Sequence, residues 1–311
     1  MVKRLFITLV TLFLVSLLTF AAFTIIPGDR ALLALGIEAS DEQVAALRAE
    51  LGLDRSFPVQ YLSWLGGFLT GKLGNSSRFR GESISGLVLE RLPVSAALGA
   101  LSLIFIILIS AGAVLVSVRR EGSFSDRLMN TLTALNISLP GFFLGVLFIW
   151  IFGLCLRLFS PGTYVSYADD FGGFLGCLIF PALAIAVPNA ALVVKFLRTS
   201  IFQQLHRDYV RTALSKGNTR RRVLYRHVLK NACLPAVTLL GMIVAEVFSG
   251  SIVIEQVFTI PGIGRLLIAS INSRDYPLVQ TLVVYIAFIV VLANTLVDIA
   301  IQVIDPRIRI K

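Results

Sequence analysis

The sequence predicts an all-α membrane protein with six transmembrane helices. Of its 311 residues, 56% are apolar and 15% are charged, whereas soluble domains average about 25% charged residues. The mean hydropathy of +0.85 is too high for a surface that faces water, which excludes a soluble globular protein. Three cysteines and two histidines in the whole chain are too few for a disulfide or metal framework.

The apolar residues gather in six long runs, which we interpret as the membrane spans. A span needs roughly 20 mostly apolar residues to cross about 30 Å of hydrocarbon. Because no water is present there to satisfy backbone groups, and the runs are too uniform for barrel strands, each is expected to be a helix. Lys3 and Arg4 also fit a signal peptide, but no cleavage site follows them, so the first helix is expected to be uncleaved. The runs cover residues 5–26, 95–118, 132–158, 174–196, 236–254 and 280–304.

The basic residues predict the direction of the chain through the membrane. With both termini in the cytoplasm, 18 of the 28 lysine and arginine residues lie on the cytoplasmic side. The net charge of +10 is therefore mainly an asymmetry across the membrane, and no nucleic-acid partner is expected. The loop 195–235 contains ten basic residues and one acid, Asp208, which is more than orientation alone requires.

The outer segment 27–93 is too polar to span the membrane. Ser40 begins an amphipathic helix that Gly52 ends, and a glycine-punctuated loop then leads to a short helix before Pro93. Residues 66–72 match the first seven positions of a phosphate-binding loop, but no strand precedes them and no hydroxyl residue follows, so we reject that match. The segment fits an outer docking ledge or a stabilising cap.

The inner loop 195–235 predicts two short helices with a basic rim. A break at residues 216–218 separates a first helix from a second one at 219–232. Two interpretations are open: a knob that docks onto a protein, or a basic amphipathic surface that lies on anionic lipid. The apolar residues that recur every four positions on the first helix are Ile201, Leu205, Tyr209 and Ala213.

Residues 208–217, Asp-Tyr-Val-Arg-Thr-Ala-Leu-Ser-Lys-Gly, resemble the cytoplasmic "EAA" loop of ABC-importer permeases. The dipeptide/oligopeptide/nickel branch commonly has Arg-Thr-Ala in place of Glu-Ala-Ala. Leu234–Pro235 lies farther beyond Gly217 than in the general motif, which fits this branch and not the sugar permeases. The resemblance extends over nearly the whole chain, in order, at residues 51–54 with 58–61, 90–93, 258–265, 274–277 and 305–309.

This resemblance implies a type I importer permease fold in the inner membrane. It divides the chain into a first transmembrane helix (1–26), an extracytoplasmic loop (27–94), a five-helix core (95–304) and a cytoplasmic tail (305–311). The implied partners are membrane lipid, a second homologous permease subunit, two ATP-binding cassette subunits and an extracytoplasmic binding protein. The chain itself is expected to have no catalytic, cofactor or metal site, because ATP and magnesium would be used by the ATPase subunits.

The coupling loop, residues 197–235, carries the site that the resemblance implies. Its 209–217 helix would dock on the ATPase and transmit the closure of the ATPases to the membrane helices. A small residue at 213 allows close helix approach, Gly217 permits the turn that ends the helix, and Arg211 and Lys216 would form rim contacts to the ATPase. The predicted coupling residues are Tyr209, Arg211, Thr212, Ala213, Lys216 and Gly217.

Glu246 is the candidate residue for the transport pathway. A carboxylate at mid-span costs roughly 2.5–3.5 kcal/mol on insertion scales, so it is by default a functional candidate. It would either face a peptide amine or a metal cation in the pore, or form a hydrogen bond to another helix. Asp298, near the inner end of the last run, is expected to be structural.

The remaining polar residues predict packing or surface roles. His206 and His227 are expected on the surface. The three cysteines are expected in apolar packing, and a disulfide between Cys155 and Cys177 stays open. Pro140, Pro181 and Pro188 are expected at kinks or at the ends of spans. The sequence therefore favours a permease for short peptides, with a nickel or metal-chelate importer as the alternative. A self-sufficient secondary transporter would require matched broken repeats, and an intramembrane enzyme would require a catalytic dyad; neither is evident.

Overall fold

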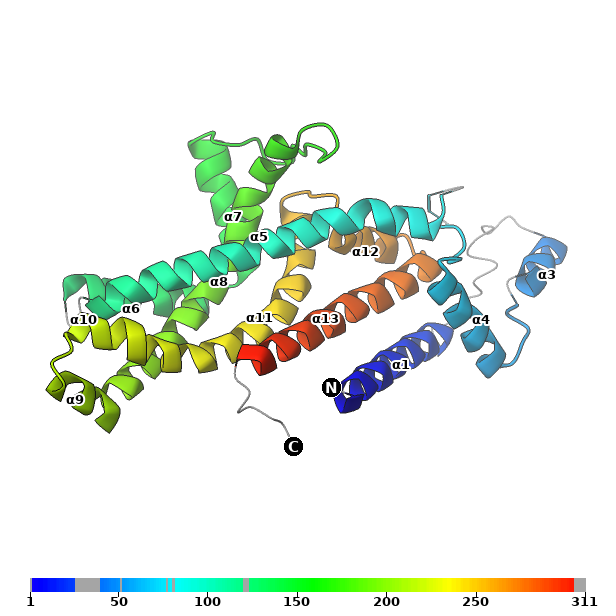
Figure 1. The fold of residues 1–311 in the computed structure, drawn as a ribbon. Coiled ribbons are helices and arrows are strands. Elements are labelled where there is room, and N and C mark those ends of the chain that lie inside the picture. Colours follow the sequence, from blue (N-terminus) through cyan, green and yellow to red (C-terminus); the bar gives the residue numbers. More distant parts are fainter. Residues whose placement is uncertain are drawn as a thin grey trace. The chain divides into compact units, whose positions relative to one another are not determined.

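The computed structural model describes residues 2–25, 40–50, 52–76, 78–79, 82–119 and 123–304. Within these ranges the regular structure is helical, apart from a single antiparallel bridge between Asn75 and Ser83. The helices, labelled in Figure 1, are Val2–Ile25 (α1), Asp41–Glu50 (α3), Phe57–Thr70 (α4), Ile84–Arg119 (α5), Phe124–Ser138 (α6), Gly141–Phe148 (α7), Phe171–Leu205 (α8), Asp208–Ser215 (α9), Arg220–Val223 (α10), Leu229–Val257 (α11), Ile263–Asn272 (α12) and Tyr276–Ile304 (α13), with π-helical turns at Ile149–Cys155 (η1) and Leu224–Val228 (η2).

Five of the described helices are long and apolar enough to cross a membrane. They coincide with five of the six predicted runs, which confirms the all-α membrane class. Pro93 lies inside α5, so the short helix expected before it is the beginning of that helix. The spanning segments are Phe6–Ile25, Ile84–Val118, Phe171–Leu205, Pro235–Val257 and Tyr276–Val297.

The remaining predicted span, residues 132–158, is not a single continuous helix. This segment is instead a bent pair, α6 followed by α7 and η1, with an angle of 106° between its two parts. Leu139 is extended at φ −96° and ψ 127°, because the residue before a proline is driven out of the helical region. Pro140 in turn provides no backbone N–H to continue α6. The chain therefore breaks at these two residues and begins α7 in a new direction.

The outer segment begins its first helix as predicted. The Ser40 hydroxyl accepts from the Gln43 backbone N–H at 3.3 Å, and the Gln43 side chain accepts from the Ser40 N–H at 3.1 Å. This reciprocal pair is a capping box, and Gly52, with φ +67°, ends the turn after α3. Residues 66–70 belong to α4, which confirms that the stretch is not a phosphate-binding loop.

The chain forms two compact units, one of residues 1–95 with 261–292 and the other of residues 96–260 with 293–311. In the first unit, aromatic rings pack α1 onto α4. Phe20, only 2% exposed, lies 5.4 Å from the Phe57 ring and 5.5 Å from the Tyr61 ring in edge-to-face geometry. The Tyr61 hydroxyl lies 2.8 Å from that of Ser16, so the polar group of this buried ring is satisfied.

A buried carboxylate, Asp275, fixes the start of α13 in the same unit. It is 1% exposed, and its Oδ1 accepts from the Leu278 N–H at 3.4 Å, which caps the helix. Its Oδ2 accepts from the Ser76 hydroxyl at 2.5 Å and the Arg78 N–H at 3.2 Å. The loop that precedes α5 is thereby attached to the turn between α12 and α13.

The second unit is built around α8. This helix packs against α6, α7 and α11, and 56% of its most apolar window is buried inside the chain, against 11–33% for the other spans. Pro181 and Pro188 lie inside α8, so they mark neither of its ends. The other spans therefore leave more of their apolar surface exposed, whereas α8 is the internal axis of the unit.

An ion pair joins α6 and α8 at one end of this unit, and a hydrogen bond attaches α5 to the same carboxylate. Arg198 of α8 lies 2.9 Å from the carboxylate of Asp126 in α6 and donates to the Asn130 side chain at 2.7 Å. The Ser117 hydroxyl of α5 donates to the other Asp126 oxygen at 2.5 Å. Asp126 is 4% exposed, so these donors, instead of water, stabilise its negative charge.

We expect Asp126→Ala to lower the free energy of unfolding by about 3 kcal/mol, because it leaves a partly buried arginine without its partner. Asp169→Ala, at an exposed carboxylate, is the matched control and should change stability by less than about 0.5 kcal/mol. Unfolding in mixed micelles measures both. An Asp126→Ala protein as stable as the control would contradict this role for the ion pair.

Candidate functional site

The predicted coupling residues lie on α9 and on the turn that follows it. α8 ends at Leu205 and α9 begins at Asp208, so the expected single helix through this region is two helices separated by a short break. The apolar residues predicted to share one face do so across the break. Ile201 is fully buried, and Leu205, Tyr209 and Ala213 pack against the same core.

The inner face of α9 is held by the chain itself. Val210 is 5% exposed and belongs to the core that Val194, Val223 and Val228 also form. The Tyr209 hydroxyl donates to the Gln204 side chain at 3.0 Å. Tyr209 and Ala213 therefore orient α9 on the second unit.

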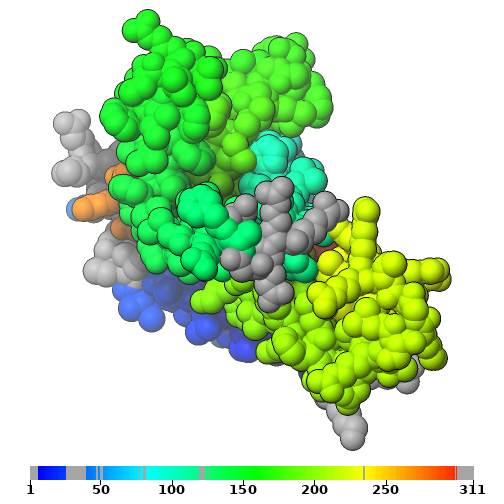
Figure 2. All heavy atoms as spheres, turned by 90° about the vertical axis from the view of Figure 1, so that its left-hand side faces the viewer, coloured from blue at the N-terminus to red at the C-terminus, as the bar shows by residue number. Residues whose placement is uncertain are grey.

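The outer face of α9 carries polar and charged side chains. The segment that contains it projects as a yellow-green lobe at the lower right of Figure 2. Leu214, 37% exposed, lines a hollow of about 1000 Å³ beside α9, together with Phe202 and Tyr225 among others. The exposed residues of α9 and of the turn directly after it are Asp208, Arg211, Thr212, Leu214, Ser215, Lys216 and Gly217.

The turn after α9 requires glycine. Gly217 has φ +81°, a left-handed conformation that costs other residues roughly 1–2 kcal/mol. Its N–H donates to Leu214 at 2.9 Å, and the Asn218 side chain donates to the Ala213 carbonyl at 3.0 Å. These bonds satisfy carbonyls that the helix end leaves unpaired.

The second helix of the loop does not end at residue 232 as expected. α10, capped by the Thr219 hydroxyl, passes through the π-helical turn η2 directly into α11, and Pro235 lies within α11. Apolar residues on both sides of Pro235 continue the buried face, so the proline removes one hydrogen bond without ending the helix. The turn at Gly217 is thus connected to a membrane span by continuous helix.

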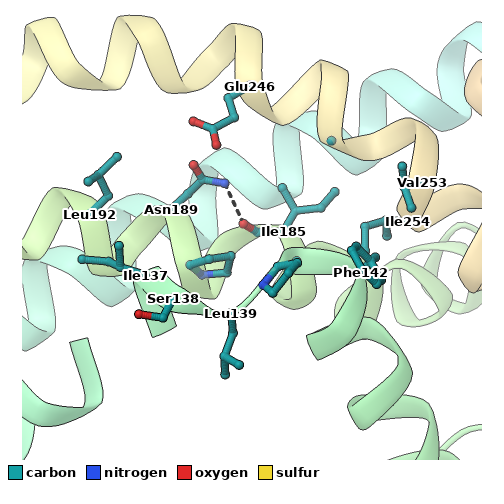
Figure 3. A pocket seen from close by; sticks show the side chains of 14 residues that line it. Ile137, Ser138, Leu139, Phe142, Ile185, Asn189, Leu192, Glu246, Val253 and Ile254 are labelled. Atoms are coloured by element: carbon teal, nitrogen blue, oxygen red, sulfur yellow. Dashed lines mark hydrogen bonds between the residues drawn. The ribbon is translucent and has the colours of Figure 1, made fainter. Parts of the chain in front are cut away.

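A cavity of about 500 Å³ lies where the bent pair meets α8 and α11. The end of α6, the break and the start of α7 form one wall, and the other two helices complete it (Figure 3). Its lining is mostly apolar. The residues with polar side chains in the lining are Ser138, Asn189 and Glu246.

Glu246 projects from α11 toward Asn189 of α8 (Figure 3). Asn189 is 8% exposed, and its Nδ2 donates to the Ile185 carbonyl at 2.9 Å. Glu246 is exposed in the chain. The structure therefore places the predicted pathway residue, Glu246, at a cavity. It also places there the Asn189 amide, which the sequence analysis did not single out. A polar residue directly after Pro188 inside an apolar span is the signal that could have identified it.

The other singled-out residues form no second site in the described part of the chain. His206 and His227 are exposed, and the described residues contain no group of three potential metal ligands. Cys155 and Cys177 are free, so no disulfide joins them, and burial raises the pKa of the Cys233 thiol. The Asp298 side chain and the 305–309 motif lie outside the described residues.

Comparison with known proteins shows which class this fold and site define. Residues 104–310 match the family model of the binding-protein-dependent transport system inner membrane component, and residues 1–99 match the model of its N-terminal region. The chain belongs to this family of multi-pass inner-membrane transport proteins.

Relatives that match this chain over nearly their whole length carry more specific names. A peptide permease protein of Brucella ovis is 38% identical over 311 residues, which cover 99% of this chain and 98% of the relative. A peptide ABC transporter permease of Sinorhizobium fredii is 35% identical over 307 residues, and the oligopeptide transport permease AppB of Bacillus subtilis is 32% identical over 310, with the same coverage of each chain.

We expect Gly217→Ala to destabilise the turn after α9 by about 1–2 kcal/mol, because alanine is strained at positive φ. Gly176→Ala is the matched control: at both positions an added Cβ meets nothing within 4 Å, but only Gly217 has a positive φ. Hydrogen exchange of residues 208–223 should become faster in the first variant alone. Equal exchange in both variants would show that φ is not the constraint.

Proposed function

We propose that this chain is the membrane-spanning subunit of an importer for short peptides. The observation that carries the proposal is the full-length similarity to proteins named as peptide and oligopeptide permeases. A nickel or metal-chelate importer is the less favoured alternative, because these similar proteins are named for peptides or oligopeptides. The permease itself performs no chemistry, and ATP with magnesium is used by separate subunits.

In the proposed assembly, the chain pairs with a second homologous permease and stands on two ATPase subunits. The lobe that contains α9 lies on the cytoplasmic side, and a binding protein delivers peptide from the other side. The apolar faces left exposed on the spans, such as Phe6, Leu18 and Trp150, suit lipid or the second permease, since a soluble surface would not retain them.

α9 is the proposed coupling element. Its exposed face, with Arg211 and Thr212, and Lys216 directly after it contact the ATPase. Tyr209 and Ala213 position the helix by packing against the buried core of this chain. Because the turn at Gly217 leads through α10 and η2 into α11, a displacement of α9 is transmitted along a continuous helix. Closure of the ATPases on ATP would move this connection and change the side to which the pathway opens.

Uptake into vesicles tests the proposed substrate. The complete transporter in proteoliposomes that enclose ATP, with its binding protein outside, should accumulate labelled tripeptide and should not accumulate nickel ions. The same vesicles without ATP are the control. Accumulation of nickel in preference to tripeptide would contradict the peptide assignment.

Charge reversal tests the coupling element. We expect Arg211→Glu to reduce ATP-dependent uptake roughly tenfold, because a like charge or a lost contact at a docked interface weakens the complex. Lys230→Glu makes the same change at an exposed residue of α11, outside α9, and should retain uptake. Copurification of the ATPase gives a second measurement. Full uptake and full ATPase recovery with Arg211→Glu would show that the exposed face of α9 is not the docking surface.

A further inference from the structure

The cavity at the break between α6 and α7 is lined by a carboxylate, Glu246, that has no part in the proposed coupling of α9 to the ATPase. Glu246 lies in the spanning part of α11, where an ionised carboxylate without a partner is costly. Among the described residues, the structure gives it neither an ion pair nor a side-chain hydrogen bond, although it lines a space of about 500 Å³. The carboxylate is therefore available to a cation that enters the cavity.

Asn189 supplies a second acceptor at a fixed position. Its Nδ2 is engaged by the Ile185 carbonyl, and this bond determines the orientation of the amide. The Oδ1 atom remains as the acceptor on the side of Glu246 (Figure 3). Two carboxylate oxygens and one amide oxygen suit an ammonium group, which has three N–H donors and no acceptor.

The helix ends at the cavity do not reverse this preference. The last turn of α6 lines the cavity with its carbonyl end, which carries about half a negative charge, and α7 begins there with about half a positive charge. These partial charges oppose each other. The full charge of Glu246 therefore decides the sign of the potential, and the cavity is expected to attract cations.

We propose that Glu246 and Asn189 bind the ammonium group of the transported peptide. This inference rests on the proposed function and names the chemical group of the substrate that the membrane subunit itself recognises. A nickel ion fits the cavity less well, because nickel prefers imidazole nitrogens among the protein ligands and no histidine or cysteine lines the cavity. The apolar lining, with Leu139, Phe142 and Leu192, would contact peptide side chains without selecting their sequence.

Protection of a cysteine in the cavity tests the proposal without relying on the binding protein. Ser138, exposed in the cavity wall, is changed to cysteine in a chain whose Cys155, Cys177 and Cys233 are serine. The complete transporter in lipid nanodiscs is labelled with a maleimide in the presence of tri-alanine or N-acetyl-tri-alanine. We expect the acetylated peptide, which lacks the ammonium group, to require a concentration about tenfold higher for half-protection.

Variants at Glu246 locate the preference. In Glu246→Gln the two peptides should protect equally, whereas Glu246→Asp, which retains the charge, should keep a measurable preference for tri-alanine. Glu82→Gln removes an exposed carboxylate outside the cavity and should leave the tenfold difference unchanged. The labelling rate without peptide reports whether each variant keeps the cavity.

Three results would overturn the proposal: equal protection by both peptides with Glu246 present, a preference that survives in Glu246→Gln, or stronger protection by nickel chloride alone than by tri-alanine. The first of these uses unaltered Glu246 and does not depend on the folding of a variant. Peptide uptake by the unmodified transporter is measured separately, so a failure of the ammonium site is distinguishable from a failure of the peptide-importer assignment.

Discussion

The break at Leu139 and Pro140 is the constraint on which the cavity between α6, α7, α8 and α11 depends. In hydrocarbon, a helix cannot end without exposing backbone groups that no water satisfies. Here the chain ends α6 and turns by 106° into α7 against α8 and α11, and the cavity lies at that junction. Interrupted backbone at membrane depth is tolerated where it lines a cavity. The proline therefore determines where polar groups can accumulate inside an otherwise apolar unit.

Two positions in the C-terminal half of α8 make separate contacts in the second unit. One part of α8 presents Asn189 to the cavity, and Arg198, nine residues later, holds α6 through Asp126. Both ends of α6 are thus attached to the same helix, one by an ion pair and one at the cavity wall. A shift of α8 therefore affects the cavity and the attachment of α6 together.

The sequence predicted most of the fold because its strongest signal is the length of apolar runs, which the hydrocarbon thickness sets directly. The sequence also identified Gly217 and Glu246. Each depends on one physical property of a single residue: a glycine permits the turn that ends a helix, and a carboxylate is costly inside an apolar span. The bend at Pro140 was underestimated because a proline in an apolar run predicts a kink or an end without giving an angle. Pro93, Pro181, Pro188 and Pro235 all lie inside helices.

Contacts between distant segments were beyond sequence reasoning. The bond between Ser76 and Asp275 joins residues 199 positions apart, and neither residue has a local pattern that indicates the other. The four-residue repeat that includes Ala213 identifies one face of a helix. It does not show whether that face packs on this chain or on another protein. The structure shows that this face packs on the chain's own core.

The two-sided construction of α9 has an evolutionary consequence. Since Tyr209, Val210 and Ala213 hold the helix from one side, residues such as Arg211 and Ser215 on the opposite side can be exchanged without refolding the lobe. Under the coupling role proposed for α9, its compatibility with a particular ATPase subunit can then diverge by a few surface substitutions. Duplicated transporters could become insulated from one another in this way while the membrane architecture stays the same.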